Sequence, residues 1–168
     1  MACTNCGLIH VPTRFHLSDA DEKERYDLHR NYSDDPLYRA FLNKVAQPLL
    51  DRLQPGSCGL DFGSGPGPTL SLMLSEAGMP MTIYDKFYAN ETAALNRSYN
   101  FITATEVLEH LGEPMADIRR LWHCLKPGGY FAAMTQMVSI INPFERWRYK
   151  DDPTHLCFFK PQTILWLA

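Results

Sequence analysis

The sequence lacks the features that would tie it to a membrane, a secretory route or a nucleic acid. It has no apolar run near the roughly 20 residues that a membrane-spanning helix needs, and its first residues lack the apolar core of a signal peptide. Its net charge of -3 gives no overall attraction to nucleic acid or to an anionic membrane. Its five cysteines are an odd number without a disulfide pattern. We therefore expect a cytoplasmic protein with no membrane partner and no indication of a nucleic-acid partner.

The length and composition are those of a single globular domain. A chain of 168 residues can bury a substantial core. Apolar residues make up 45% and charged residues 21%, which is ordinary for a soluble fold.

Cys3 and Cys6 form a CxxCG knuckle, a spacing at which two thiolates can provide half of a tetrahedral zinc site. The other three cysteines, Cys58, Cys124 and Cys157, are isolated in segments expected to belong to the core. The sequence therefore supplies no second pair. Two interpretations stay open: a zinc half-site, or a free pair left from a ribbon whose other knuckle is absent.

Residues 19–53 are predicted to be helical. Asp19 or Asp21 is expected to cap the first part. Pro48 is expected to bend or divide the second part. An apolar residue recurs at every fourth position there, which is typical of one packed helix face. These residues are Leu37, Phe41, Val45, Leu49 and Leu53.

A glycine-rich turn at residues 63–67, GSGPG, separates a strand-like run at 58–62 from a predicted helix at 69–78. Such a turn between a parallel strand and a helix N-terminus favours ligand binding, because glycine lets the backbone approach the ligand and the free amides attract an anionic group. A dinucleotide fingerprint would need glycine where this chain has Pro68. A nicotinamide or flavin cofactor is therefore not expected.

A second predicted strand, residues 81–85, ends in Asp85. An acid at this place can accept both ribose hydroxyls of a nucleoside. The alternative is a solvated aspartate in a turn.

These stretches together resemble a known family. LDFGSGPG, then Asp85, then FITATEVLEHL and LKPGGYFAAMT are similar, in this order, to the successive motifs of class I S-adenosylmethionine-dependent methyltransferases. The tail DPTHLCFF is similar to a segment of small bacterial members, and CxxCGLIHVP and RYDLHRN resemble one bacterial branch with an N-terminal knuckle. The resemblance implies a Rossmann-like, doubly wound α/β fold with a mostly parallel sheet in the order 3-2-1-4-5.

The resemblance also implies roles for individual residues. Those expected to hold the methionine part of the donor are Asp61, Gly63, Ser64, Gly65 and Gly67. Those expected at the ribose and adenine are Asp85, Lys86 and Phe87. Those expected at the donor's edge are Thr105, Glu106 and Val107. Those expected on an N-terminal lid are Tyr26, His29 and Tyr38.

Methyl transfer from a sulfonium is an in-line displacement, which needs alignment and, for a hydroxyl or amine acceptor, one base of near-neutral pKa. The candidates are His155, His110 and His29, with His155 first because its DPTH turn is expected to face the methyl group. Asp151 and Asp152 are expected to orient it. Plain structural roles stay open for these histidines, and Glu106 and Glu109 can equally be ordinary first-turn acids.

Two departures from the family pattern affect the sheet. Only fifteen residues separate Asp85 from Phe101, so the third strand is expected to be reduced to residues 92–95 or absent. The usual final antiparallel strand pair is missing, which predicts a C-terminally shortened member with an open edge on the fifth strand, residues 130–137. We expect a homodimer through this edge, or shielding by residues 138–168. The apolar residues beside it are Met134, Met137, Val138, Ile140 and Ile141.

The sequence thus predicts three parts: a knuckle segment at 1–18, a helical lid at 19–56 and an S-adenosylmethionine-binding core at 57–168. The predicted activity is methyl transfer to an unidentified small-molecule acceptor. The alternative is a module that binds S-adenosylmethionine or S-adenosylhomocysteine without catalysis.

Overall fold

A parallel sheet forms the centre of the computed structural model, which describes residues 1–28, 31–139 and 143–167. Its four strands are β2 (Gly59–Phe62), β3 (Met81–Tyr84), β4 (Tyr99–Thr105) and β5 (Leu125–Met134). They are arranged in the order β3-β2-β4-β5, and every neighbouring pair is parallel. Because β2 is central, its C-terminal end lies beside those of β3 and β4.

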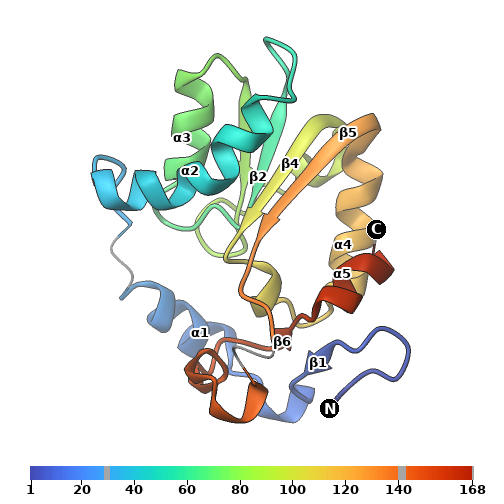
Figure 1. Ribbon diagram of the computed structural model, residues 1–168. Helices are drawn as coiled ribbons and strands as arrows, with labels where there is room; N and C mark the ends of the chain where they lie inside the picture. The colour runs from blue at the N-terminus through green and yellow to red at the C-terminus, as the bar shows by residue number, and fades with distance from the viewer. Residues whose placement is uncertain (29–30, 140–142, 168) are drawn as a thin grey trace.

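Helices cover both faces of this sheet. α2 (Pro36–Leu50) and α3 (Thr69–Glu76) lie on one face, and α4 (Pro114–Cys124) lies on the other (Figure 1). Successive side chains of β4 point to opposite faces of the sheet, so the core has two parts. Phe101 packs with α2 and α3 on one face, whereas Ile102 packs with α4 on the other. The expected α/β doubly wound architecture is confirmed. No helix in the described ranges is both long enough and apolar enough to cross a membrane.

No strand forms in the described residues between β3 and β4, so the expected third strand is absent and not merely reduced. Residues Thr92–Asn96 form a 3-10 helix, η2, instead of a strand. It is held by its backbone carbonyls, because Ala94 accepts from the Tyr99 hydroxyl at 2.8 Å and Leu95 accepts from the Cys124 thiol at 3.2 Å. So short a connection has no room for another strand with its crossover helices. The 3-10 turn fills the space with two buried side chains instead.

The N-terminal helices begin with capping side chains. Helix α1 (Asp19–Tyr26) is capped by Ser18, whose hydroxyl accepts from the Asp21 amide at 3.3 Å, so the expected aspartate cap is wrong. Asp21 instead accepts from that hydroxyl at 2.6 Å.

Pro48 does not divide α2, because it lies in the last turn, where its missing N–H removes only one helical hydrogen bond.

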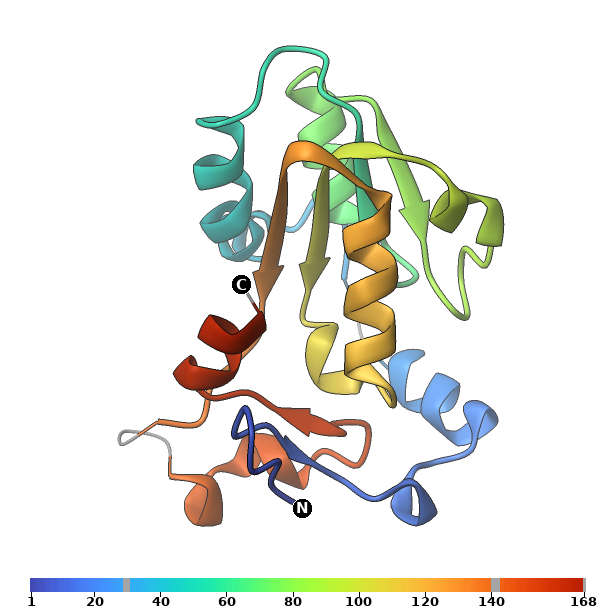
Figure 2. The same cartoon turned by 90° about the vertical axis from the view of Figure 1, so that its right-hand side faces the viewer.

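Both ends of the described chain meet below the C-terminal tips of the strands. β1 (Ile9–His10) pairs antiparallel with β6 (Cys157–Phe158), and α1 lies in the same layer (Figures 1 and 2). Cys6 and Leu8 belong to the main core cluster. The remaining elements are η1 (Thr13–Phe15), η3 (Leu108–His110), η4 (Phe144–Arg146), η5 (Arg148–Asp151) and α5 (Pro161–Leu167). We call the layer formed by the N- and C-terminal segments, residues 1–28 and 143–167, the cap.

The outer edge of β5 pairs with no other strand in the described residues. The chain beyond β5 does fold back, since Met137 bridges Phe159 and the Val138 amide donates to the Phe159 carbonyl at 2.9 Å. These contacts lie past the end of β5 and leave its edge uncovered. Ile140 and Ile141 lie outside the described residues. Association through the edge stays a prediction.

Candidate functional site

A cavity of about 520 Å³ lies at the C-terminal ends of β2, β3 and β4, a volume suited to a small organic ligand. Its walls come from the turns that follow these three strands, from α1 and α2, and from the cap. This is the place where ligands bind in open parallel sheets. We call it the central cavity.

The glycine loop after β2 forms one wall. Gly63 has φ +73° and a Cβ there would lie 2.4 Å from a Val107 methyl carbon, so only glycine fits. Gly65 also has a left-handed φ, +65°, and its amide donates to Asp85 Oδ2 at 2.8 Å. Ser64 lines the cavity between them.

Asp85, which follows β3, organises the second wall. Its carboxylate is largely buried and accepts from the Gly65 amide through one oxygen and from the Phe87 and Tyr88 amides, at 2.8 and 3.1 Å, through the other. These contacts tie the turn after β3 to the glycine loop. Oδ1 already accepts two hydrogen bonds and Oδ2 only one, so Oδ2 can accept a further hydrogen bond from a ligand. Lys86 and Phe87 line the cavity beside it.

Asp61 and Gly67 do not line the central cavity. Asp61 is buried behind the loop and accepts from the Thr103 hydroxyl at 2.7 Å. Burial raises the pKa of Asp61 to about 6, although hydrogen bonds from Thr103 and the Ser71 amide oppose the shift. A Cβ on Gly67 would lie 2.4 Å from the Asn31 carbonyl oxygen. Asp61 therefore supports the loop from behind, and Gly67 lies where the loop passes too close to Asn31 for a side chain.

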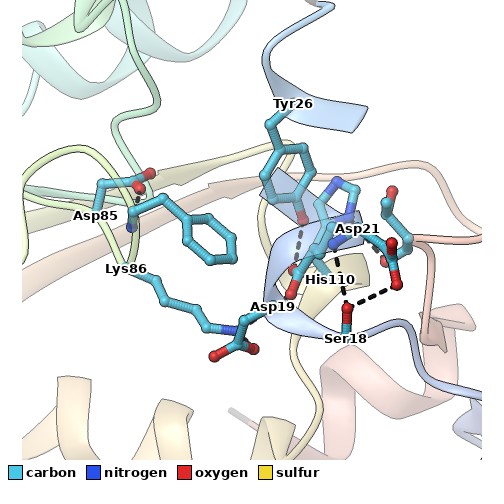
Figure 3. A network of polar contacts seen from close by, with 10 residues as sticks. Ser18, Asp19, Asp21, Tyr26, Asp85, Lys86 and His110 are labelled. Carbon is cyan, nitrogen blue, oxygen red and sulfur yellow. Dashed lines mark hydrogen bonds and ion pairs between the residues drawn. The ribbon is translucent and has the colours of Figure 1, made fainter. Parts of the chain in front are cut away.

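Helix α1 lines the cavity with Glu22 and Tyr26, and its role as a lid stays a prediction. Lys86 Nζ pairs with Asp19 at 2.7 Å and with Glu22 at 3.1 Å, which fastens the helix to the turn after β3 (Figure 3). The Tyr26 ring lies 5.9 Å from that of Phe87 and 5.3 Å from that of His110, measured between centroids.

Two further lid candidates differ in their placement. Tyr38 lines the cavity from α2, where burial raises the pKa of its hydroxyl. His29 lies outside the described residues.

The chain after β4 forms the third wall, with Thr105, Glu106 and Val107. Glu106 has φ +52°, an uncommon conformation for a residue with a side chain and one that concentrates at functional sites. Burial, with repulsion from Glu109, raises the pKa of Glu106 to about 7.

His110 and His155 face each other in the cavity, with ring centroids 4.8 Å apart. His110 Nδ1 lies 2.9 Å from the Thr154 carbonyl oxygen, and His155 Nδ1 lies 2.6 Å from that of Tyr149. Burial lowers the pKa of His110, which favours its neutral form.

The two aspartates expected to orient His155 differ in their placement. Asp152 accepts from the amide and hydroxyl of Thr154 at 3.0 and 2.7 Å, so it braces the turn that carries His155. Asp151 is exposed and pairs with Lys150 at 2.5 Å.

Glu109 and Tyr149 both line the cavity, although neither was among the residues expected to bind the donor or to act as the base. Glu109 is fully buried and accepts a hydrogen bond from the Tyr149 hydroxyl through Oε1. The only local signal for Glu109 was its spacing three residues after Glu106. Nothing in the sequence around Tyr149 distinguishes it from a core aromatic residue.

The knuckle lies away from this cavity. Cys6 is buried in the core and Cys3 is partly exposed, with its pKa lowered by hydrogen bonds from the Cys6 and Asn5 amides. Across residues 1–28, 31–139 and 143–167, no third Cys, His, Asp or Glu joins them in a metal-sized group. A zinc site there stays a prediction that needs ligands from elsewhere.

A protein-family model described as a methyltransferase domain matches residues 33–168. A ubiquinone biosynthesis O-methyltransferase of Proteus mirabilis is 33% identical over 72 residues, which are 43% of this chain and 29% of that protein. One of Vibrio campbellii is 32% identical over 116 residues, 64% of this chain and 49% of that protein. The chain therefore spans less than half of the length of these curated relatives.

Solved structures show the same fold. A coclaurine N-methyltransferase bound to N-methylheliamine and S-adenosylhomocysteine superposes with a TM-score of 0.54 at 16% identity, over 80% of this chain and 49% of that one. A methyltransferase of calicheamicin biosynthesis in its S-adenosylhomocysteine-bound form gives 0.50 at 15% identity, over 78% and 49% of the two chains.

Proposed function

The chain belongs to the family of proteins with a methyltransferase domain, and on that premise we propose that it transfers a methyl group from S-adenosylmethionine to a small-molecule acceptor. The donor would lie in the central cavity. Its methionine part would follow the glycine loop, its ribose would bind Asp85, and its adenine would lie beside Lys86 and Phe87.

One observation carries this proposal. In the described part of the chain, three buried side-chain oxygens have no hydrogen-bond partner, and their residues, Ser64, Thr105 and Glu109, all line the central cavity. A buried polar atom left unpaired costs about 1–3 kcal/mol, so such atoms in one cavity indicate a polar ligand. The Ser64 and Thr105 oxygens belong to the glycine loop and to the chain after β4, the two walls along which we place the donor.

The charge of the cavity also fits this donor. Five acidic residues line it: Glu22, Asp85, Glu106, Glu109 and Asp152. Lys86 is the one Lys or Arg among its described lining residues, and it is already paired with acids of α1. S-adenosylmethionine carries a positive sulfonium and an ammonium group, and an acidic cavity favours both.

We propose an acceptor that is flat and carries a hydroxyl group. Four of the aromatic lining residues, Tyr26, Tyr38, Phe41 and Tyr149, can pack against a ring. The relatives named ubiquinone biosynthesis O-methyltransferases agree with transfer to oxygen. Alignment of the acceptor oxygen with the sulfonium methyl would supply most of the acceleration. We propose that the histidine pair activates the hydroxyl.

Calorimetry with S-adenosylmethionine, S-adenosylhomocysteine and NAD tests the donor. We expect micromolar binding of the first two, about -8 kcal/mol, and far weaker binding of NAD. Asp85→Ala should weaken donor binding by roughly 2–3 kcal/mol, because charge-assisted hydrogen bonds are lost. Glu91→Ala removes an exposed acid from the same connection and should leave binding unchanged. NAD binding as tight as that of the donor would overturn the proposal.

Methyl transfer itself needs a separate assay. The protein should convert S-adenosylmethionine to S-adenosylhomocysteine when simple phenols are supplied as acceptors. Tight donor binding without any conversion, including automethylation, would contradict the enzyme and favour a non-catalytic binding module.

A further inference from the structure

Three side chains at the acceptor end of the central cavity lie close enough to share one ion. Glu109, His110 and His155 each place a ligand atom within 4.8 Å of the others, and no other such group of three occurs in the described ranges. We propose that they bind a divalent transition-metal cation such as Zn²⁺, which holds the oxygen of the methyl acceptor. The cation site stands on its own geometry, whereas its role toward the acceptor rests on the proposed function.

The hydrogen bonds of both histidines prepare them as ligands. A carbonyl oxygen can only accept, so the Nδ1 atoms of His110 and His155 carry the protons that they donate to Thr154 and Tyr149. In the neutral rings the lone pair is therefore on Nε2. This arrangement, with one ring nitrogen fixed by a backbone carbonyl and the other left for the ion, is usual for metal-binding histidines.

Glu109 supplies the independent observation. Its side chain is fully buried, its Oε1 accepts from the Tyr149 hydroxyl, and its Oε2 is buried with no partner. A buried carboxylate oxygen is stable when it is paired or bound to a metal. A cation between the carboxylate and the two imidazoles would satisfy Oε2 without disturbing the Tyr149 bond, which would orient the ligand from outside.

The surroundings favour a cation over a water molecule or an anion. Glu106 and Asp152 add two further carboxyl groups to this end of the cavity. Arg25, which is not in the lining, pairs with Asp152 at 4.0 Å, and Lys86, the one Lys or Arg in the described lining, is engaged by α1. The field from these groups attracts positive charge.

The ligand types select the metal class. Two imidazole nitrogens and one carboxylate suit Zn²⁺ and its transition-metal neighbours, whereas Mg²⁺ and Ca²⁺ prefer oxygen ligands. In a tetrahedral zinc site adjacent ligand atoms are about 3.3 Å apart, so small side-chain rotations would close the cluster from its present spacing. Three protein ligands leave a position open, as in catalytic sites.

An open position facing the cavity gives the cation a task. A hydroxyl bound there would lose its proton to solvent more readily, because a bound cation lowers its pKa. The resulting oxygen would then form the new C–O bond with the sulfonium methyl carbon. The C–S bond breaks and its electron pair stays on sulfur, giving S-adenosylhomocysteine. The histidines would thus act through the ion and not by taking the proton themselves.

Cobalt(II) is the probe for the site, since it replaces zinc and reports its ligands by absorption. We use the full chain with Cys3→Ser and Cys6→Ser, stripped with EDTA, so that the knuckle cannot contribute. We expect one Co²⁺ per chain with visible bands and no thiolate charge-transfer band. Glu109→Gln and His155→Gln should each weaken binding more than about 100-fold, beyond the loss typical for an outer-shell partner. His123→Gln, which removes an exposed histidine, should bind as the parent does.

Circular dichroism of each variant keeps the result interpretable. Folded parent protein that binds no Co²⁺, or folded variants that bind it unchanged, would overturn the site. Acetohydroxamate, a bidentate oxygen donor, should shift the Co²⁺ bands, and an unchanged spectrum would overturn the open position. Donor calorimetry on the EDTA-treated protein separates the two proposals: Co²⁺ binding without donor binding refutes only the methyltransferase, and the reverse refutes only the metal site.

Discussion

Replacing Asp61 by Asn should remove a pH dependence of stability that originates under the glycine loop. Burial raises the pKa of Asp61 from 3.8 to about 6 in the folded protein. Between these values the folded chain holds a proton that the unfolded chain has lost, so the free energy of unfolding falls as pH rises. At about 1.4 kcal/mol per pH unit, the stability lost between about pH 4 and pH 6 amounts to about 3 kcal/mol.

Urea unfolding of the wild type and of Asp61→Asn, at several pH values from 4 to 7, measures this difference. Asparagine keeps an acceptor for the Thr103 hydroxyl but has no proton to lose, so the variant should lack that part of the slope. Glu91→Gln neutralises an exposed acid and should keep the wild-type slope. Equal slopes for the wild type and Asp61→Asn would refute the reasoning, because Asp61 would then ionise in the fold at no cost.

Other parts of the structure give further predictions. Gly63→Ala should lower the free energy of unfolding by about 1–3 kcal/mol more than Gly56→Ala, because both have positive φ but only the first would meet another side chain. Equal losses in urea titrations would rule out that clash. Lys86→Met should cost less than about 1 kcal/mol, since its ion pairs are exposed, yet it should speed limited proteolysis near α1. An unchanged cleavage rate would show that these pairs do not fasten the lid. Met137→Lys should convert a wild-type dimer to monomer in light scattering, and a monomeric wild type would contradict association through the β5 edge.

The sequence predicted that the glycine loop and Asp85 meet in one site, because their signals are local. The glycine loop and Asp85 lie at the ends of adjacent parallel strands, where the βαβ topology brings them together. Gly65 and Asp85 are indeed joined by a hydrogen bond. The short connection before β4 also showed that the third strand could not be complete, although not that a 3-10 turn replaces it.

The acceptor side could not be predicted in the same way, because its residues come from segments that meet only in the folded chain. Glu109 looked like an ordinary first-turn acid until its burial and its contact with Tyr149 were known. His155 was a candidate base, but its partner at Nδ1 is a backbone carbonyl that no sequence pattern marks. The N-cap residue of α1 was wrongly predicted to be an aspartate. Ser and Asp are both common N-cap residues, and here Ser18 and Asp21 hydrogen-bond each other, so residue type alone did not distinguish them.

The pairing of β1 with β6 sets an order for assembly during synthesis. Strands β2 to β5 and helices α2 to α4 lie between residues 36 and 134, so they leave the ribosome before β6 does. The cap closes only when Ile9 meets Phe158 near the other end of the chain, a long loop whose closure is slow and entropically costly. Tyr149 and His155 arrive with that last step. The end of the central cavity that these two residues line is therefore the part of the structure that forms last.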